Sequence, residues 1–173
     1  MMLAVGGAPE GNALAVEMAG RHGATLSAAV GYDRHCAAMD LARDDLDSLL
    51  DRRNCVVAVG EIGLDFHYEP ETRDQQKALL GRMLDQARAR RLPVIVHSRE
   101  SNDDMLGLLA EHVRLWKGPS DRLGVLHCFT GEEGFARSVL DLGLHISFSG
   151  ILTFRNADSI RKAAGIIPDD RLL

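Results

Sequence analysis

Within its first half, this 173-residue chain reads Cys55-Val56-Val57-Ala58-Val59-Gly60-Glu61. The run is apolar and rich in β-branched residues, which is typical of a strand buried in a parallel sheet, and a carboxylate follows it directly. Two later runs end in a comparable way, residues 93–96 before His97 and residues 123–126 before His127. The repetition predicts three equivalent strands, each followed by a polar side chain at its carboxyl end.

If these three strands are neighbours, Glu61, His97 and His127 meet at one rim of the sheet, where α/β enzymes hold their catalytic groups. Imidazole suits zinc and other first-row ions, and a carboxylate can bridge two ions. A single histidine after a strand is more often a structural hydrogen-bonding group. Three metal-compatible residues at equivalent positions indicate a metal site instead.

Apolar, β-rich segments alternate with helical patterns along the chain, which is typical of repeated strand-helix units around a parallel sheet. Six strands and the start of a seventh are predicted, at residues 3–5, 26–30, 56–59, 94–96, 124–126, 145–148 and 171–173. The length suits one domain with a real core, and no linker divides it. We therefore predict a single α/β domain over residues 1–173.

Two architectures fit this order of elements. One is an open, doubly wound sheet, and the other is a TIM-type (β/α)8 barrel, which typically needs about 250 residues. The chain ends inside an apolar run, Arg171-Leu172-Leu173. Natural domains seldom stop there, because the strand would lack its neighbours. We therefore expect an incomplete barrel whose first strand and most of whose last strand are missing.

The helices between the strands have recognisable patterns. After Ser101, an apolar stripe recurs at helical spacing and includes Met105, Leu109 and His112. It predicts that His112 belongs to the core and is not a metal ligand. Three helix starts match the reciprocal capping pattern, namely Thr72 with Gln75, Ser101 with Asp104 and Thr130 with Glu133.

Composition excludes several classes of protein. With 46% hydrophobic and 26% charged residues the chain is typical of globular proteins, and its net charge of −5 offers no broad basic surface for nucleic acid. The three cysteines, an odd number without a paired motif, indicate a reducing compartment. The start lacks a secretion signal, and no apolar run reaches the length of about 18 residues that a membrane span needs. We expect a cytoplasmic protein.

Four longer segments, three of which contain Glu61, His97 or His127, follow one another along the chain. They are Val59-Gly60-Glu61-Ile62-Gly63-Leu64-Asp65-Phe66-His67-Tyr68-Glu69, Pro93-Val94-Ile95-Val96-His97-Ser98-Arg99-Glu100, Leu126-His127-Cys128-Phe129-Thr130-Gly131 and Ile146-Ser147-Phe148-Ser149-Gly150-Ile151-Leu152-Thr153-Phe154. Together they resemble the TatD family of metal-dependent deoxyribonucleases, a branch of the amidohydrolase-like barrels. The resemblance covers nearly the whole chain. It implies a (β/α) barrel with two divalent metal ions (zinc, magnesium or manganese) that hydrolyses phosphodiester bonds. It also implies that Glu61 binds or bridges the ions and that His97 and His127 are ligands.

The chain departs from the family's pattern at three places. The family begins with a strand bearing a His-x-His pair and ends with a Glu-Thr-Asp motif, and neither is present here. After the strand that ends at Gly31, the family usually has a His-Pro pair, whereas this chain has Asp33-Arg34 followed by His35. Either Asp33 or His35 replaces that histidine, or the segment is a solvated loop that begins the next helix.

Other polar residues lie near the predicted metal site. Arg99 has two interpretations: it holds a non-bridging phosphate oxygen in the reaction, or it forms a structural ion pair with Glu100 or a neighbouring helix. Asp65 and His67 closely follow the metal-binding carboxylate and either orient a ligand or contact substrate. Of Phe66 and Tyr68, one is expected to pack inward, which leaves the other available to stack on a base.

The preferred function is therefore a metal-dependent hydrolase of DNA, a deoxyribonuclease acting on strand ends, with Glu61 and Arg99 as catalytic residues. A second hypothesis keeps the fold and the metals but takes an amide or lactone substrate, since fold alone does not select between them. A third is an inactive fragment of either enzyme, because about half of the expected ligands are missing. DNA is the expected partner, and no obligate protein partner is inferred.

Overall fold

The structure is a computed structural model and describes residues 1–41 and 45–173. Six parallel strands form one sheet, and they are neighbours in the order in which they occur in the chain. They are β1 (Met2–Gly7), β2 (Leu26–Tyr32), β3 (Val56–Asp65), β4 (Val94–Arg99), β5 (Gly124–Leu126) and β6 (His145–Ile146). All six predicted strands are therefore confirmed, and β3 is longer than the apolar run that predicted it.

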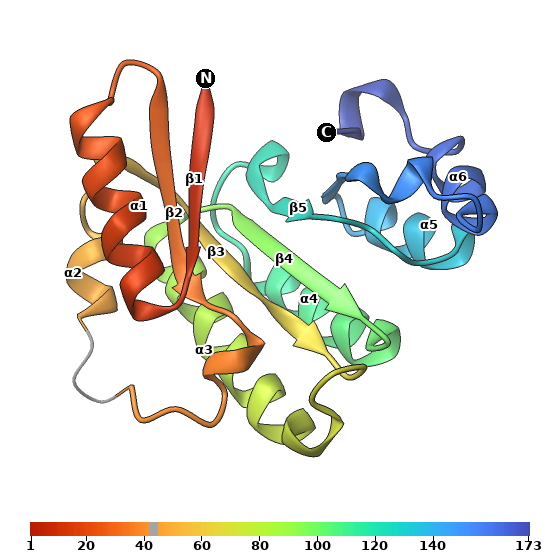
Figure 1. The fold of residues 1–173 in the computed structure, drawn as a ribbon, viewed down its shortest axis with the longest axis horizontal. Helices are drawn as coiled ribbons and strands as arrows, with labels where there is room; N and C mark the ends of the chain where they lie inside the picture. The colour runs from red at the N-terminus through yellow and green to blue at the C-terminus, as the bar shows by residue number, and fades with distance from the viewer. Residues whose placement is uncertain (42–44) are drawn as a thin grey trace.

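The strand order distinguishes the two predicted architectures. A doubly wound sheet reverses its order at a switch point, whereas a barrel adds each new strand on the same side of the previous one. The uninterrupted order from β1 to β6 has the second form. The prediction of a barrel-type arrangement is confirmed, and the doubly wound alternative is wrong. Within residues 1–41 and 45–173 the sheet is not closed (Figure 1).

The predicted seventh strand begins where expected. Leu172 forms a parallel bridge with Ile146, and the Leu173 N–H donates to the Ile146 carbonyl oxygen at 3.0 Å. The last residues of the chain thus lie beside β6, as the next strand of a barrel would.

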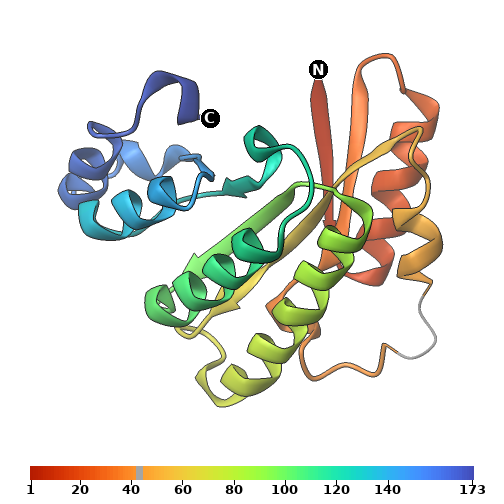
Figure 2. The same ribbon diagram turned by 180° about the vertical axis from the view of Figure 1, so that it is seen from behind.

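Helices connect the strands and cover the outer face of the sheet. They are α1 (Pro9–Arg21), α2 (Leu46–Leu50), α3 (Arg73–Arg90), α4 (Asn102–Leu115), α5 (Glu133–Asp141) and α6 (Asp158–Ala164). Helices α3 and α4 lie behind the sheet in Figure 1 and in front of it in Figure 2. Among the described residues, none of these helices is long and apolar enough to cross a bilayer.

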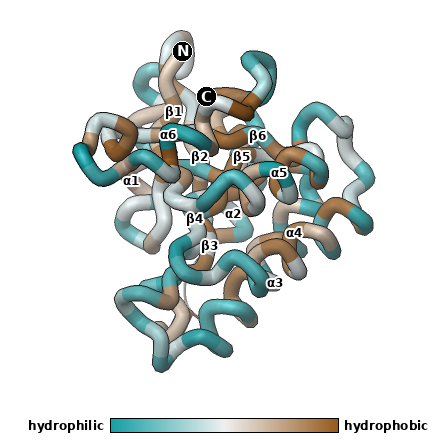
Figure 3. The backbone as a smooth tube through the Cα atoms, turned by 90° about the vertical axis from the view of Figure 1, so that its right-hand side faces the viewer, coloured by the Kyte–Doolittle hydropathy of each residue, from teal (hydrophilic) through white to brown (hydrophobic). Residues whose placement is uncertain are grey.

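The core has two parts because successive side chains of a strand point to opposite faces. The larger part fills the space between the sheet and the helices and includes Val30, Val59 and Leu80. The smaller part, Ala29, Ala58 and Ile95, lies on the inner face. Figure 3 shows apolar segments along the strands and on parts of α3 and α4, with hydrophilic segments in many of the loops.

The sequence predicted where two of three helices begin, but the predicted capping hydrogen bonds are not formed at Thr72 and Ser101. Helices α3 and α4 begin directly after Thr72 and Ser101, but neither side chain caps its helix, and α5 begins later than the third pattern predicts. The Thr72 hydroxyl donates to the Glu69 carbonyl oxygen at 3.0 Å, and Ser101 Oγ lies 2.9 Å from Ser98 Oγ. The Thr72 oxygen, which would accept the capping hydrogen bond, instead accepts one from the Gln76 side-chain amide at 3.0 Å.

His112 is buried in the core, as its place in the apolar stripe predicts, and its ring lies 5.4 Å from that of Trp116. Burial and the nearby Arg88 guanidinium lower the pKa of His112 from 6.5 to about 4. Because this pKa is lower in the folded than in the unfolded chain, protonation favours unfolding. The stability that the neutral ring contributes is complete above pH 6.5 and is lost as the pH falls toward 4.

We therefore expect the free energy of unfolding to fall by about 2 kcal/mol between about pH 7.5 and about pH 5, measured by urea denaturation. His112→Leu should remove most of this pH dependence. His22→Gln, a change at an exposed histidine after α1, should leave it in place. An unchanged pH dependence in His112→Leu would contradict the assignment to His112.

Candidate metal centre

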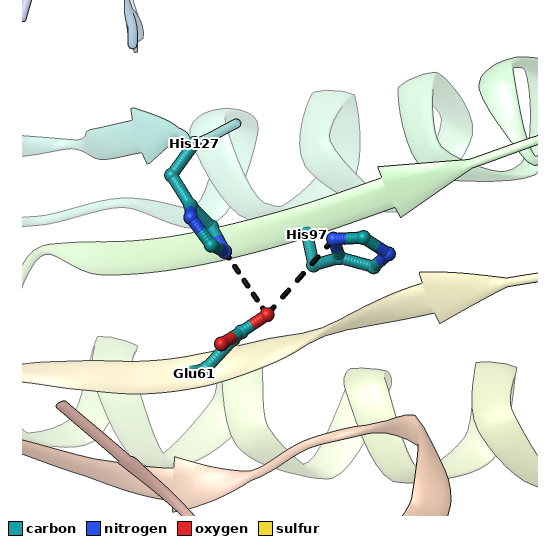
Figure 4. Close-up of side chains that lie close together, drawn as sticks. All are labelled: Glu61, His97 and His127. Carbon is teal, nitrogen blue, oxygen red and sulfur yellow. Dashed lines mark ion pairs between the residues drawn. The ribbon is translucent and has the colours of Figure 1, made fainter. Parts of the chain in front are cut away.

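Three side chains from successive strands meet at the carboxyl end of the sheet. Glu61 lies on β3, His97 on β4, and His127 directly after β5. Glu61 Oε1 is 3.0 Å from His127 Nε2 and 3.9 Å from His97 Nδ1 (Figure 4). One ligand atom from each residue lies within 4.8 Å of the others. The structure thus brings together the three residues that the sequence proposed as metal ligands.

Two glycines beside Glu61 allow β3 and β4 to approach closely. A Cβ atom on Gly60 would lie 2.7 Å from the Ile95 Cβ, and one on Gly63 would lie 2.1 Å from the His97 carbonyl oxygen. The pairing of β3 with β4 shifts register between Val59 and Ile62, and Gly63 is the partner of His97. The close approach positions Glu61 against the strand that carries His97.

The Glu61 carboxylate is held in its charged form. Burial alone would raise its pKa, but the close contact and charge of His127, with His97 and Arg34 nearby, lower the pKa below its usual value of 4.5. The side chain is therefore ionised at neutral pH. An ionised carboxylate is the form that binds a divalent cation.

Asp65 lies behind His97 and is 1% exposed. Its Oδ2 atom is 3.3 Å from His97 Nε2, while its Oδ1 accepts hydrogen bonds from the backbone N–H groups of His67 at 3.0 Å and Tyr68 at 3.2 Å. Burial opposes ionisation, but these hydrogen bonds, His97 and Arg34 lower the pKa of Asp65. The carboxylate therefore orients the imidazole so that its Nδ1 atom faces Glu61.

Arg99 and His67 lie outside the group of Glu61, His97 and His127. The Arg99 guanidinium carbon is 4.7 Å from the centre of the Tyr68 ring. His67 Nδ1 is 2.7 Å from Glu100 Oε1, so the neighbouring acid that could have paired with Arg99 contacts the histidine instead. Among the described residues Arg99 forms no ion pair. The structural ion pair considered for Arg99 is thus not formed there.

The segment after β2 is not a solvated loop. Asp33 is 4% exposed, its N–H donates to the Gly7 carbonyl oxygen at 2.8 Å, and its Oδ2 lies 2.8 Å from Arg34 Nη1 and 3.3 Å from His35 Nδ1. A Cβ atom on Gly7 would lie 3.6 Å from the Asp33 Cβ and 3.7 Å from the Glu61 Cβ. The Asp33 and Glu61 side chains thus both lie close to Gly7, whereas the His35 side chain is about half exposed.

Arg34 is the charged group that sequence reasoning missed. Its Nη1 atom contacts Asp33, its Nε atom lies 3.3 Å from Asp65 Oδ2, and its charge helps to lower the pKa of Glu61. The charged Asp33-Arg34 pair in place of the family's His-Pro pair was the available signal. A charge introduced next to an expected ligand changes the electrostatics of the whole site.

The chemistry of these residues fits a divalent cation. The set contains one ionised carboxylate and two imidazoles, all partly buried, and nitrogen donors suit zinc and other first-row metals. Magnesium and manganese prefer oxygen ligands, so the two histidines favour zinc among the three metals considered. The three residues can therefore hold an ion between β3, β4 and β5.

Comparisons with known proteins agree with this fold. A family model described as "TatD related DNase" matches residues 1–173. The chain is 48% identical to the "Uncharacterized metal-dependent hydrolase YcfH" of Escherichia coli (strain K12) over 118 residues, which covers 68% of this chain and 43% of that protein. It is 37% identical to the "3'-5' ssDNA/RNA exonuclease TatD" of Klebsiella pneumoniae (strain 342) over 125 residues, or 72% of this chain and 46% of that protein.

A solved structure shows the same arrangement of strands and helices. The crystal structure of YJJV, a TatD homolog from Escherichia coli K12, matches with a TM-score of 0.81 at 32% sequence identity and covers 99% of this chain and 64% of that chain. The present chain thus spans less than half the length of the two relatives described above and about two thirds of this barrel. With a family model matched along its full length and a metal-compatible group at the expected rim, the chain belongs to the TatD family of metal-dependent hydrolases.

Proposed function

We propose that this protein is a metal-dependent hydrolase that cleaves phosphodiester bonds in DNA from a strand end. The observation that carries the proposal is the meeting of Glu61, His97 and His127 at the carboxyl end of a TatD-family sheet. The family model is described as a DNase, and one relative is named as a single-strand exonuclease. Both names support a nucleic acid substrate over an amide or a lactone.

A phosphodiester resists hydrolysis because its negative charge repels hydroxide. A bound divalent ion would lower the pKa of its water from 15.7 toward about 7 and would neutralise charge on the phosphate oxygens. In our proposal two such ions are present, and Glu61 binds or bridges them. His97 and His127 complete the ligands on the side of β4 and β5.

The remaining residues have supporting roles in the proposal. Asp65 is a positioning residue that fixes the His97 ring and so affects the reaction only through that ring. Arg99 lies two residues beyond His97 on β4 and has no carboxylate partner among the described residues, so its planar N–H groups can donate to a non-bridging phosphate oxygen. His67, on the loop after β3, contacts substrate at the rim. With a net charge of −5, attraction to DNA depends on such local cations.

We also place this chemistry in the cytoplasm. The three cysteines, an odd number without a paired motif, support a reducing compartment.

The proposal predicts manganese- or zinc-dependent release of nucleotides from single-stranded DNA by the 173-residue chain. Chromatography of the products after incubation with and without EDTA measures it. His127→Ala should reduce the rate by at least about 100-fold, because it removes a ligand of the ion, whereas Glu111→Gln on the exposed face of α4 should not. Hydrolysis of lactones or amides without nucleotide release, or no hydrolysis by protein that binds metal, would contradict the proposal.

A further inference from the structure

We propose that Tyr68, packed against Arg99, is the surface on which an unpaired nucleobase of the substrate stacks next to the metal centre. This inference rests on the proposed function and adds a substrate-binding residue to it. The relevant residues lie on the loop that follows β3 and at the end of β4.

Tyr68 and Phe66 have opposite environments, which decides between the two aromatic residues of this segment. Phe66 is 6% exposed and lies under Arg73, whose guanidinium carbon is 4.2 Å from the centre of the ring. Tyr68 is 63% exposed although it is a large aromatic residue. Only Tyr68 therefore presents a ring to an incoming ligand.

The Tyr68 ring is supported on two sides. The Arg99 guanidinium lies over it, with the guanidinium carbon 4.7 Å from the ring centre, and the His67 ring meets it nearly edge-on at 4.8 Å and 83°. His67 is itself fixed by Glu100, 2.7 Å away. A ring that is held in this way loses little further freedom when a base stacks on it, so binding costs less conformational entropy.

A short path connects this ring to the metal centre. The Tyr68 N–H donates to Asp65 Oδ1, and the other oxygen of the same carboxylate lies 3.3 Å from His97 Nε2. On β4, Arg99 and His97 are two residues apart and so lie on the same face of the strand. Tyr68 is thus linked to the proposed ligand His97 through the buried Asp65 carboxylate, and its neighbour Arg99 lies two residues beyond His97 on β4.

The chemistry of this surface fits a nucleotide better than an amide or a lactone. A guanidinium that contacts a ring with its face keeps the N–H groups in its plane available for a phosphate oxygen. Base stacking on an aromatic side chain contributes about 1–3 kcal/mol per base and tolerates every base. In a duplex, neighbouring base pairs cover both faces of an internal base. The surface therefore admits an unpaired base and excludes the internal bases of a duplex.

The test measures binding of hydrolysis-resistant phosphorothioate oligonucleotides in the presence of Mn²⁺ by fluorescence anisotropy. One set is single-stranded and carries all its bases; a second set has the same length with an abasic residue at one end or the other. We expect at least one of the two abasic strands to bind the wild-type protein about 5- to 100-fold more weakly than the complete strand does.

Tyr68→Ala should bind the complete strand more weakly than wild type by the same factor. It should bind the complete and the abasic strands with equal affinity. Tyr68→Phe keeps the ring and should behave like wild type. Leu14→Ala, which removes an exposed apolar side chain from the outer face of α1, serves as the matched control and should have no effect.

The outcomes separate the two proposals. If neither abasic end weakens binding to the wild-type protein, or if Tyr68→Ala still prefers the complete strand, the stacking surface is wrong while the nuclease proposal stands. If the metal-loaded wild-type protein binds none of the oligonucleotides, the proposed function fails and this inference fails with it.

Discussion

Glu61→Gln is expected to lower the affinity of the protein for zinc or manganese by more than about 100-fold. Loss of a group that only supports a metal ligand already costs about 10- to 100-fold, and Glu61 is proposed as a ligand itself. Its carboxylate contacts both His127 and His97, and its lowered pKa keeps it charged at neutral pH. The amide has nearly the same shape but no charge, so the two histidines would remain without their anionic partner.

Isothermal titration of metal-free protein with ZnCl2 or MnCl2 measures this effect. Glu111→Gln makes the same chemical change on the exposed surface of α4, where its ion pair with Arg114 spans 3.8 Å, and should bind metal like the wild type. Circular dichroism should show the same secondary structure for both variants. Wild-type metal affinity in Glu61→Gln would remove this residue from the site.

Gly63→Ala is expected to disrupt both the metal centre and the sheet. The added Cβ atom would lie 2.1 Å from the His97 carbonyl oxygen and 2.8 Å from its carbonyl carbon. These are backbone atoms of the neighbouring strand, so no side-chain rotation relieves the overlap. Strands β3 and β4 must move apart at the position where Gly63 pairs with His97. We expect a loss of about 3 kcal/mol or more in the free energy of unfolding, with weakened metal binding.

Gly107→Ala is the matched control for this substitution. Gly107 lies within α4, and a Cβ atom there would have no neighbouring atom within 4 Å. The same change should therefore stabilise the protein by about 0.5–1 kcal/mol, because alanine favours the helix over glycine. Urea denaturation and metal titration of both variants provide the comparison. Equal stability of Gly63→Ala and wild type would show that the strands are not in such close contact.

The sequence predicted that the three side chains of the candidate metal centre meet, because their meeting follows from one rule. Glu61, His97 and His127 each follow or end an apolar run, and the carboxyl ends of adjacent parallel strands lie on one rim. Neither the apolar runs nor the rule requires knowledge of distant contacts. The barrel was preferred over the doubly wound sheet because the chain ends inside an apolar run and its segments resemble the TatD family, and the order of the strands in the structure confirms that choice.

The surroundings of the ligands were harder to predict because they depend on contacts between segments far apart in the chain. Nothing near Asp33 in the sequence indicates that it is buried beside Gly7, or that Arg34 reaches Asp65. Asp65 was expected to orient a ligand or to contact substrate, and its burial beneath His97 favours the first role. Such distinctions depend on side-chain packing and not on local pattern.

The distribution of the three proposed metal ligands over three strands links metal binding to folding. Glu61, His97 and His127 belong to successive strand-helix units, so the site exists only while β3, β4 and β5 are assembled. An ion that binds the assembled sheet and not the unfolded chain stabilises the native state, by about 2.7 kcal/mol at a free concentration 100 times its Kd. The ion would thus act as a cross-link between three strand-helix units. These units lie side by side in the sheet in the same order in which the chain is synthesised.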